Sequence, residues 1–258
     1  MQLIEERCTS IPGGCIVYDA ACVRKAGDEL FDRSAWAAEG RQQRVTGGRG
    51  AISIIEHPGV RWVLRHYRRG GFAARLSEDR YLWLGAARTR SFAEWRLLAR
   101  MRALGLPVPR PIAARYRRHL LTYSADLITE MLEQTITLAQ ALDSSGVESR
   151  QWREIGRTIY GFHQHGIHHA DLNAHNILLC ALSTPAQAPS LEPPVYVLDF
   201  DRGRIRARGA WEEQVLARLR RSLEKVCARG GRAFSHEQWE LLMEGYRDGE
   251  RRTASGER

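Results

Sequence analysis

The sequence has no long apolar run and no segment that resembles a secretory signal. Its uninterrupted apolar stretches all fall short of the ~20 residues that a membrane-spanning helix requires. The first residues, Met-Gln-Leu-Ile-Glu-Glu-Arg-Cys, carry acidic side chains where a signal peptide has a basic segment followed by an apolar one. We therefore expect a folded protein that stays in the cytoplasm.

Cysteine is sparse and shows no pairing. The chain has five cysteines, an odd number, and no Cys-x-x-Cys motif. A disulfide framework or a cysteine-rich zinc site needs paired or closely spaced cysteines. The pattern predicts free thiols in a reducing compartment.

Lysine is nearly absent, although the chain is basic. The formal net charge is +9, yet Lys25 and Lys225 are the only lysines, so arginine supplies almost all of the positive charge. A basic surface suits nucleic acid, an anionic membrane or a phosphorylated substrate equally well. Charge alone therefore selects no function.

A chain of 258 residues can form one core or two small lobes, and the order of the expected elements favours two. In the first half, apolar spacing predicts strands near 16–18, 51–55, 61–67, 112–117 and 120–131, and helices at 28–39 and 89–105. The second half reads as helices at 137–144, 149–165, 211–229 and 235–247, short strands at 177–180 and 195–200, and a proline-rich surface insertion at 183–194. We predict an α+β fold with a strand-rich N-terminal lobe (1–133) and a short helical C-terminal lobe (134–258).

The most informative segment is His169-Ala-Asp171-Leu-Asn-Ala-His-Asn176, followed by a strand that ends in Asp199-Phe-Asp201. It resembles the catalytic loop of protein kinases, H-x-D-L-x-x-x-N, and their metal-binding D-F-G motif. A predicted helix precedes the loop and a short apolar strand follows it, as in kinases. The resemblance implies a bilobal protein-kinase-like fold.

Phosphoryl transfer explains these residue types, because it needs positioning and charge neutralisation more than covalent chemistry by the protein. Asp171 is the candidate catalytic base that orients the acceptor hydroxyl. Asn176 and Asp199 are candidate oxygen ligands for Mg²⁺ bound to the phosphates of ATP. We interpret His169 as an internal brace for the loop. Taken singly, Asp171 also fits a turn residue and Asp199 a strand-end cap.

The first half offers candidates for binding the nucleotide. Gly48 and Gly50 precede a strand and would let the backbone approach the phosphates, although such glycines also suit a plain hairpin turn. Kinases place a lysine on the strand that follows, and this chain has none there. Arg65, in Val-Leu-Arg, occupies that place, and Glu94 on the long helix is its expected partner. The alternative is that both are ordinary surface residues.

The acceptor is expected to be small or lipid-linked rather than a protein. Only 59 residues follow Asp199, and no A-P-E motif ends an activation segment. Residues 58–77 contain several basic side chains and no acid, and arginines alternate at 202, 204, 206 and 208, which would place them on one side of an extended strand. Both patterns favour an anionic acceptor or membrane surface, although each also fits a solvated surface.

Four segments of the chain show a closer resemblance to one bacterial kinase family. The segments 62–71, 106–111, 169–178 and 198–203 look like those of the bacterial 3-deoxy-D-manno-octulosonic acid (Kdo) kinases, which belong with the lipopolysaccharide core heptose kinases. The resemblance implies phosphorylation by ATP of the 4-hydroxyl of Kdo on a lipid A precursor, an anionic glycolipid. It also implies a peripheral position at the cytoplasmic face of the bacterial inner membrane. The family's catalytic aspartate falls on Asp171, and Asp201 in place of the D-F-G glycine suits this family.

Three other interpretations remain at this stage. The histidines at 163, 165, 168, 169 and 175 suggest a metallohydrolase, but they lack the H-E-x-x-H pattern. The basic charge suggests a nucleic-acid-binding module, but no recognised motif is present, and nucleic acid is not an expected partner. The missing lysine suggests a kinase-shaped protein without catalysis, although the base and metal positions are all filled.

Overall fold

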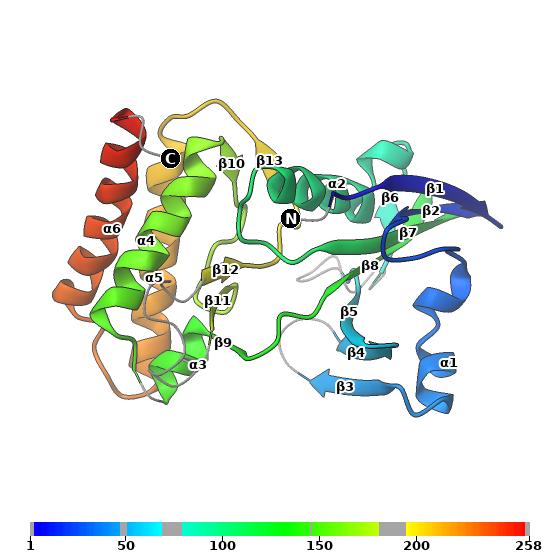
Figure 1. Ribbon diagram of the computed structural model, residues 1–258, viewed down its shortest axis with the longest axis horizontal. Helices are drawn as coiled ribbons and strands as arrows, with labels where there is room; N and C mark the ends of the chain where they lie inside the picture. The colour runs from blue at the N-terminus through cyan, green and yellow to red at the C-terminus, as the bar shows by residue number, and fades with distance from the viewer. Residues whose placement is uncertain (1–2, 47–50, 69–78, 145, 181–194, 256–258) are drawn as a thin grey trace. The chain divides into compact units, whose positions relative to one another are not determined.

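The computed structural model describes residues 3–46, 51–68, 79–144, 146–180 and 195–255 (Figure 1). By its internal contacts the chain divides into two compact units. One comprises Met1–Leu104 and Pro109–Leu132, and the other comprises Gly105–Val108 and Glu133–Arg258. The first contains a large sheet and the second is mainly helical, so the predicted α+β class is confirmed.

In its described part, the first unit is built on an eight-stranded antiparallel sheet. The strand order is β1-β2-β7-β8-β5-β4-β3, and β6 pairs with one end of β8. The strands are β1 (Glu6–Ile11), β2 (Gly14–Asp19), β3 (Gln42–Thr46), β4 (Ala51–His57), β5 (Val60–His66), β6 (Tyr81–Leu82), β7 (Pro111–His119) and β8 (Thr122–Glu130). In β5, Trp62 and Leu64 are buried in alternation with more exposed neighbours, the period-two pattern of a strand with one face in the core.

The helical segments of the first unit differ from the prediction at one place. The expected helix over 28–39 is split into a 3₁₀ turn, η1 (Asp28–Phe31), and α1 (Arg33–Ala38). Asp32 lies between them in an extended conformation, because its carboxylate accepts the N–H groups of Ser34 and Ala35 and so caps α1. A second 3₁₀ turn, η3 (Ala86–Arg88), leads into α2 (Arg90–Ala103), the long helix that the sequence predicted.

The second unit combines four helices with short strands in its described residues. The helices are α3 (Leu138–Asp143), α4 (Ser149–Gln164), α5 (Trp211–Arg229) and α6 (His236–Ala254). The strands β9 (Thr135–Thr137), β11 (Ile177–Cys180) and β12 (Val195–Val197) form one antiparallel sheet in the order β12-β11-β9, and β10 (Ile167–His168) pairs with β13 (Arg204–Ile205). None of the helices in the described ranges combines the length and apolarity that crossing a bilayer requires.

The alternating arginines after Asp201 do not line one side of an extended strand, so that expectation was wrong. The strand β13 is only two residues long. Arg202 takes a left-handed conformation (φ 61°) in the turn before it, and Arg208 forms an ion pair with Glu212 at the start of α5. The turn breaks the two-residue period on which the expectation depended.

Glycine permits the close approach of α4 and α6, which lie side by side (Figure 1). A Cβ atom added at Gly156 of α4 would lie 1.9 Å from the carbonyl oxygen of Leu242, and one added at Gly245 of α6 would lie 1.9 Å from that of Arg153. Both neighbours are backbone atoms, so no side-chain rotation relieves the clash. The helix pair therefore requires glycine at both positions.

We predict that Gly156→Ala destabilises the protein by roughly 3 kcal/mol, because the added methyl group must push the two helices apart. Gly161→Ala in the same helix is the matched control. Its Cβ would meet only a side-chain atom at 3.7 Å, and the substitution should stabilise the helix by about 0.5–1 kcal/mol. Urea or thermal unfolding measures both, and equal stabilities would contradict the tight helix contact.

Candidate active site

The segment 169–176 forms a loop between β10 and β11 that is anchored on its inner side. Leu172 and Ala174 are buried, whereas the Asp171 side chain is half exposed. The N–H of Ala174 donates to the Ser222 hydroxyl of α5 (3.1 Å), and the Ala174 carbonyl accepts the N–H of Ala139 in α3 (3.0 Å). Leu172 and Ala174 thus anchor the loop, and the carboxylate of Asp171 remains accessible.

His169 joins this loop to the chain that follows β12. The N–H of Asp171 donates to His169 Nδ1 (3.1 Å), and His169 Nε2 donates to the carbonyl of Leu198 (2.8 Å). These contacts define a neutral imidazole that carries its proton on Nε2. The ring is buried and packs against Phe200, with 4.7 Å between ring centroids. His169 is therefore the internal brace that the sequence predicted.

Burial lowers the pKa of His169 and keeps the ring neutral. The carbonyl of Leu198 and the nearby carboxylates of Asp199 and Asp171 act in the opposite direction. Both carboxylates are thus close enough to affect the same imidazole. Two of the predicted site residues, 28 positions apart in sequence, are brought into one neighbourhood.

Asn176 closes the same network. Its side-chain Nδ2 donates to the carbonyl of Asp171 (3.0 Å), and its own carbonyl accepts the N–H of Leu198 (2.8 Å). Leu198 directly precedes Asp199, so Asn176 connects the catalytic loop with the residue that carries the second candidate ligand. The three side chains predicted from sequence come from backbone segments that hydrogen bonds hold together.

Asp199 is exposed and adopts a left-handed backbone conformation with φ of 61°. This region is uncommon for residues other than glycine, although aspartate tolerates it better than most, and such outliers concentrate at functional sites. The buried Phe200 beside it fixes the chain. The conformation therefore presents the carboxylate at a position that the core determines.

The donor chemistry fits a magnesium ion. Asn176 and Asp199 offer hard oxygen ligands, and the amide nitrogen of Asn176 is already engaged with a carbonyl, which assigns its amide oxygen to any metal. In the described residues, no group of three or more His, Cys, Asp or Glu side chains is arranged to hold a metal. A site built on Asn176 and Asp199 would need phosphate oxygens and water to complete the coordination of the ion.

Arg218 of α5 also reaches the catalytic loop, and sequence reasoning missed it. Its Nη1 lies 3.1 Å from Asp171 Oδ1, and both side chains are about half exposed. Burial lowers the pKa of His168, and Arg206, Arg204 and Arg218 add to this effect, so three cations lie near the loop. The sequence could have indicated Arg218, because it lies three residues after the buried Val215 and four before Ser222. This spacing places it on the inward edge of α5.

The histidines of the second unit have different surroundings. His163 is buried in α4, where its Nδ1 hydrogen bonds to the Tyr246 hydroxyl (2.9 Å), and burial lowers the pKa of His163 to about 4. His165 and His175 are exposed. His163 thus belongs to the core that joins α4 to α6.

In the first unit, Arg65 and Glu94 form the ion pair that the sequence predicted. Arg65 Nη2 lies 2.5 Å from Glu94 Oε2, and Glu94 is only 3% exposed. The Tyr67 hydroxyl donates to the same carboxylate oxygen (2.5 Å) and accepts from Arg65 (3.2 Å). Tyr67 was not expected, although its position two residues after Arg65 places it on the same side of the chain.

The other candidates from the first unit either lie outside the described residues or have other partners. Gly48 and Gly50 lie outside the described residues, as do Arg69 and Arg75 of the basic span. His66 points to the opposite face of β5 from Arg65, where its Nδ1 contacts Asp126 (2.7 Å). Within the described part of the basic span, Arg65 and His66 therefore lie on opposite faces of β5.

The fold and the braced catalytic loop define a protein-kinase-like phosphotransferase. The solved structure titled "WaaP in complex with acyl carrier protein" shares this fold, with a TM-score of 0.53, 18% sequence identity, and coverage of 88% of this chain and 90% of that one. The model of the family described as "Lipopolysaccharide kinase (Kdo/WaaP) family" matches residues 33–246. The chain belongs to the lipopolysaccharide kinase (Kdo/WaaP) family.

Two curated relatives show how close the similarity is. The 3-deoxy-D-manno-octulosonic acid kinase of Xanthomonas campestris pv. campestris (strain B100) is 42% identical over 234 residues, which cover 90% of this chain and 89% of the relative. The protein of the same name from Stenotrophomonas maltophilia (strain R551-3) is 44% identical over 226 residues, or 87% and 85% of the two chains. The chain is thus similar to these kinases over nearly their whole length, and the predicted family is confirmed.

Proposed function

We propose that this kinase transfers a phosphoryl group from ATP to the 4-hydroxyl of Kdo on a lipid A precursor. The observation that carries the proposal is the hydrogen-bonded assembly of Asp171, Asn176 and the Leu198–Asp199 segment around the neutral His169. The names of the relatives supply the acceptor sugar, since both are Kdo kinases. The reaction would take place at the cytoplasmic face of the inner membrane, with the enzyme bound peripherally.

In this proposal Asp171 is the catalytic base. Its carboxylate is half exposed, while its backbone N–H is held by His169 and its carbonyl by the side chain of Asn176. A fixed backbone with an accessible carboxylate is what orienting an alcohol for in-line attack requires. Asp171 would accept the hydroxyl proton as the oxygen attacks the terminal phosphate.

Asn176 and Asp199 would hold Mg²⁺, which when bound neutralises negative charge on the phosphates of ATP. Arg65 would contact the nucleotide phosphates in place of the missing lysine. Glu94 and Tyr67 fix its guanidinium on one side, which orients the side chain before the nucleotide arrives. Gly48 and Gly50 would let the backbone approach the same phosphates.

The arginines near the catalytic loop favour an anionic acceptor. Arg218 is within 3.1 Å of the Asp171 carboxylate, and Arg204 and Arg206 lie near the adjacent His168. An acceptor that bears a sugar carboxylate and lipid phosphates matches this charge. We infer that the Kdo carboxylate binds Arg218 and thereby draws this cation away from Asp171.

The substitution Asp171→Asn should lower kcat by roughly 10²–10⁴-fold, because the amide cannot accept the hydroxyl proton. Labelled ATP and Kdo–lipid A precursor measure the rate, a heptosylated core serves as the competing acceptor, and circular dichroism checks the fold. Asp143→Asn, at an exposed carboxylate of the same unit, is the control. Unchanged turnover of the Asp171 variant would remove the proposed base, and a preference for the heptosylated core would change the acceptor.

We expect Arg65→Ala to lower kcat/KM for ATP by roughly 10- to 100-fold, as the loss of a charged hydrogen bond to phosphate predicts. The KM for the Kdo acceptor should change little. Arg61→Ala is the matched control, because Arg61 is exposed in the same strand. If both variants use ATP as the wild type does, Arg65 serves only to pair with Glu94.

The variant Arg218→Ala should raise the KM for the acceptor by roughly 10-fold and leave the KM for ATP unchanged, because it removes one charged contact to the sugar carboxylate. Arg221→Ala, at an exposed position in the same helix, provides the comparison. With an acceptor whose carboxyl group is esterified, the wild type and the Arg218 variant should become alike. If the substitution raises the KM for the esterified acceptor by the same factor, Arg218 acts through Asp171 instead of binding the carboxylate.

A further inference from the structure

Leucines form the tip of the β7–β8 hairpin, where a turn usually carries small or polar residues. Leu120 and Leu121 make the two-residue connection, and they are 87% and 75% exposed. Leu120 takes a positive φ of 55°, a conformation that favours glycine or asparagine and disfavours bulky side chains. The hairpin thus holds an apolar side chain in water, at a position where local backbone preference opposes it.

Two more exposed leucines lie beside this tip. The strand β6 pairs with the start of β8, and the N–H of Trp83 donates to the carbonyl of Leu121 (2.9 Å). Leu82 and Leu84, on either side of Trp83, are 60% and 61% exposed. Together these residues form a leucine edge, which we define as Leu82, Leu84, Leu120 and Leu121. Half of the large hydrophobic side chains classed as exposed in the described residues belong to it.

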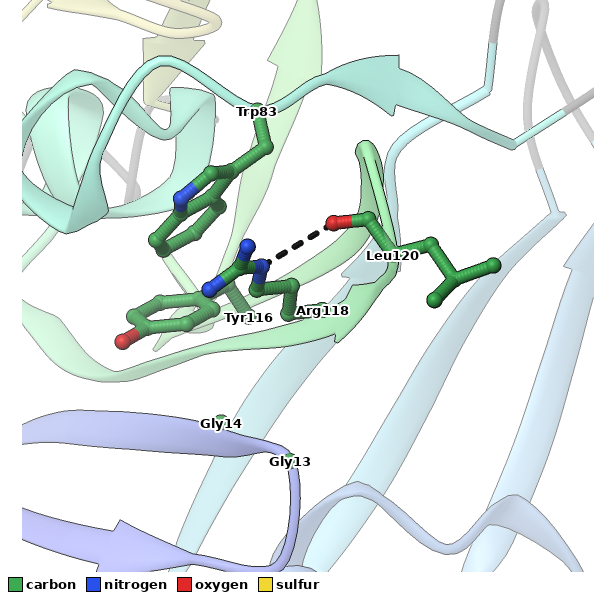
Figure 2. Close-up of a pocket in the computed structure, with 6 residues that line it drawn as sticks. All are labelled: Gly13, Gly14, Trp83, Tyr116, Arg118 and Leu120. Atoms are coloured by element: carbon green, nitrogen blue, oxygen red, sulfur yellow. Dashed lines mark hydrogen bonds between the residues drawn. The ribbon is translucent and has the colours of Figure 1, made fainter.

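Two aromatic side chains and one cationic side chain lie beside the backbone of Leu120, whose own side chain points away from them (Figure 2). The rings of Trp83 and Tyr116 pack with 4.9 Å between centroids. The Arg118 guanidinium lies 5.4 Å from the centroid of Trp83, and its Nε donates to the carbonyl of Leu120 (3.0 Å). These three side chains, with Leu120 and the Gly13–Gly14 turn, line a pocket of about 470 Å³.

The two segments that carry the leucine edge are rich in arginine, and Asp79, which directly precedes the first of them, lies 3.7 Å from Arg80. Residues 80–90 and 115–124 contain six arginines and no acidic residue. Arg115 and Arg117 are paired with Asp28, whereas Arg118 is exposed beside the leucines. Exposed apolar side chains, aromatic rings at their base and surrounding cations are the arrangement of a surface that lies in the interface of an anionic bilayer.

We propose that the leucine edge is the membrane-docking surface of this enzyme and that its partner is an anionic phospholipid bilayer. The leucines would enter the acyl region, Trp83 and Tyr116 would lie at its boundary, and Arg118 would meet lipid phosphates at the mouth of the pocket. The inference extends the proposed function, which requires access to a lipid-linked acceptor. Binding to the bilayer itself needs neither ATP nor Kdo.

The test is cosedimentation of the full chain with vesicles of phosphatidylglycerol and phosphatidylethanolamine, without ATP or acceptor. The wild type should bind these vesicles, and should bind phosphatidylcholine vesicles much more weakly. The double variant Leu120→Asn/Leu121→Ser should lose roughly 10-fold or more in partitioning, because it removes both apolar side chains of the tip. Asparagine tolerates positive φ, so this variant should melt at or above the wild-type temperature.

Val60→Ser is the matched control, because Val60 is an exposed apolar residue in the other hairpin, β4–β5, and its loss should leave binding unchanged. Leu82→Ser/Leu84→Ser tests the second part of the edge independently of the turn. Arg118→Gln should weaken binding to anionic vesicles and reduce its dependence on salt. The proposal would be overturned if the Leu120→Asn/Leu121→Ser variant bound vesicles as well as the wild type does. It would also be overturned if the same leucines captured an acidic soluble protein and the wild type bound no vesicles.

Activity on acceptor dispersed in detergent separates this inference from the proposed function. There the tip variant should match the wild type, because no bilayer is needed for access. If the wild type phosphorylates Kdo normally in detergent, and vesicle binding does not change when the leucines are replaced, the docking surface is rejected and the proposed function is kept. No phosphorylation of Kdo by the wild type in detergent would reject the proposed acceptor and leave the vesicle result to stand by itself.

Discussion

The arrangement of the candidate active site depends on the two hydrogen bonds that the neutral imidazole of His169 makes. The ring accepts the N–H of Asp171 on one ring nitrogen and donates to the carbonyl of Leu198 from the other. A protonated ring would have no lone pair for the first contact, so the burial that lowers the pKa of His169 also maintains the geometry. One residue thus connects the loop that carries Asp171, the proposed base, to the turn that carries Asp199.

In the proposed function, arginine takes the electrostatic role that lysine has in other kinases. The planar guanidinium of Arg65 contacts both Glu94 and Tyr67, a pair of partners suited to its several fixed donors. Arg218 stands beside Asp171 on the exposed side of the catalytic loop, and Arg118 stands beside the exposed leucines of the first unit. Arg65 is proposed to meet the phosphates of ATP, Arg218 the carboxylate of Kdo, and Arg118 the phosphates of bilayer lipids. Recognition of anionic groups would thus be a common purpose for the predominance of arginine.

Much of the secondary structure was predictable because its signals are local. The helices over 89–105, 149–165 and 211–229 were found within a few residues, since apolar side chains recur at helical spacing. The helix over 28–39 was wrong because Asp32 caps a new helix instead of continuing the first. The strands β6, β9 and β10 were missed because a strand of two or three residues carries no periodic pattern and forms only through its partners.

The sequence by itself determined which residues are the candidates for the chemistry, because the spacing of His169, Asp171, Asn176 and Asp199 is a property of the chain. Their arrangement was decided by tertiary hydrogen bonds, since Leu198 meets His169 and Asn176 across more than twenty residues of intervening sequence. Arg218 and the leucine edge show the same limit. A half-exposed arginine on a helix and four leucines in two separate segments have no joint signal in the sequence. Only folding places the arginine beside a carboxylate and the leucines together at one end of a hairpin.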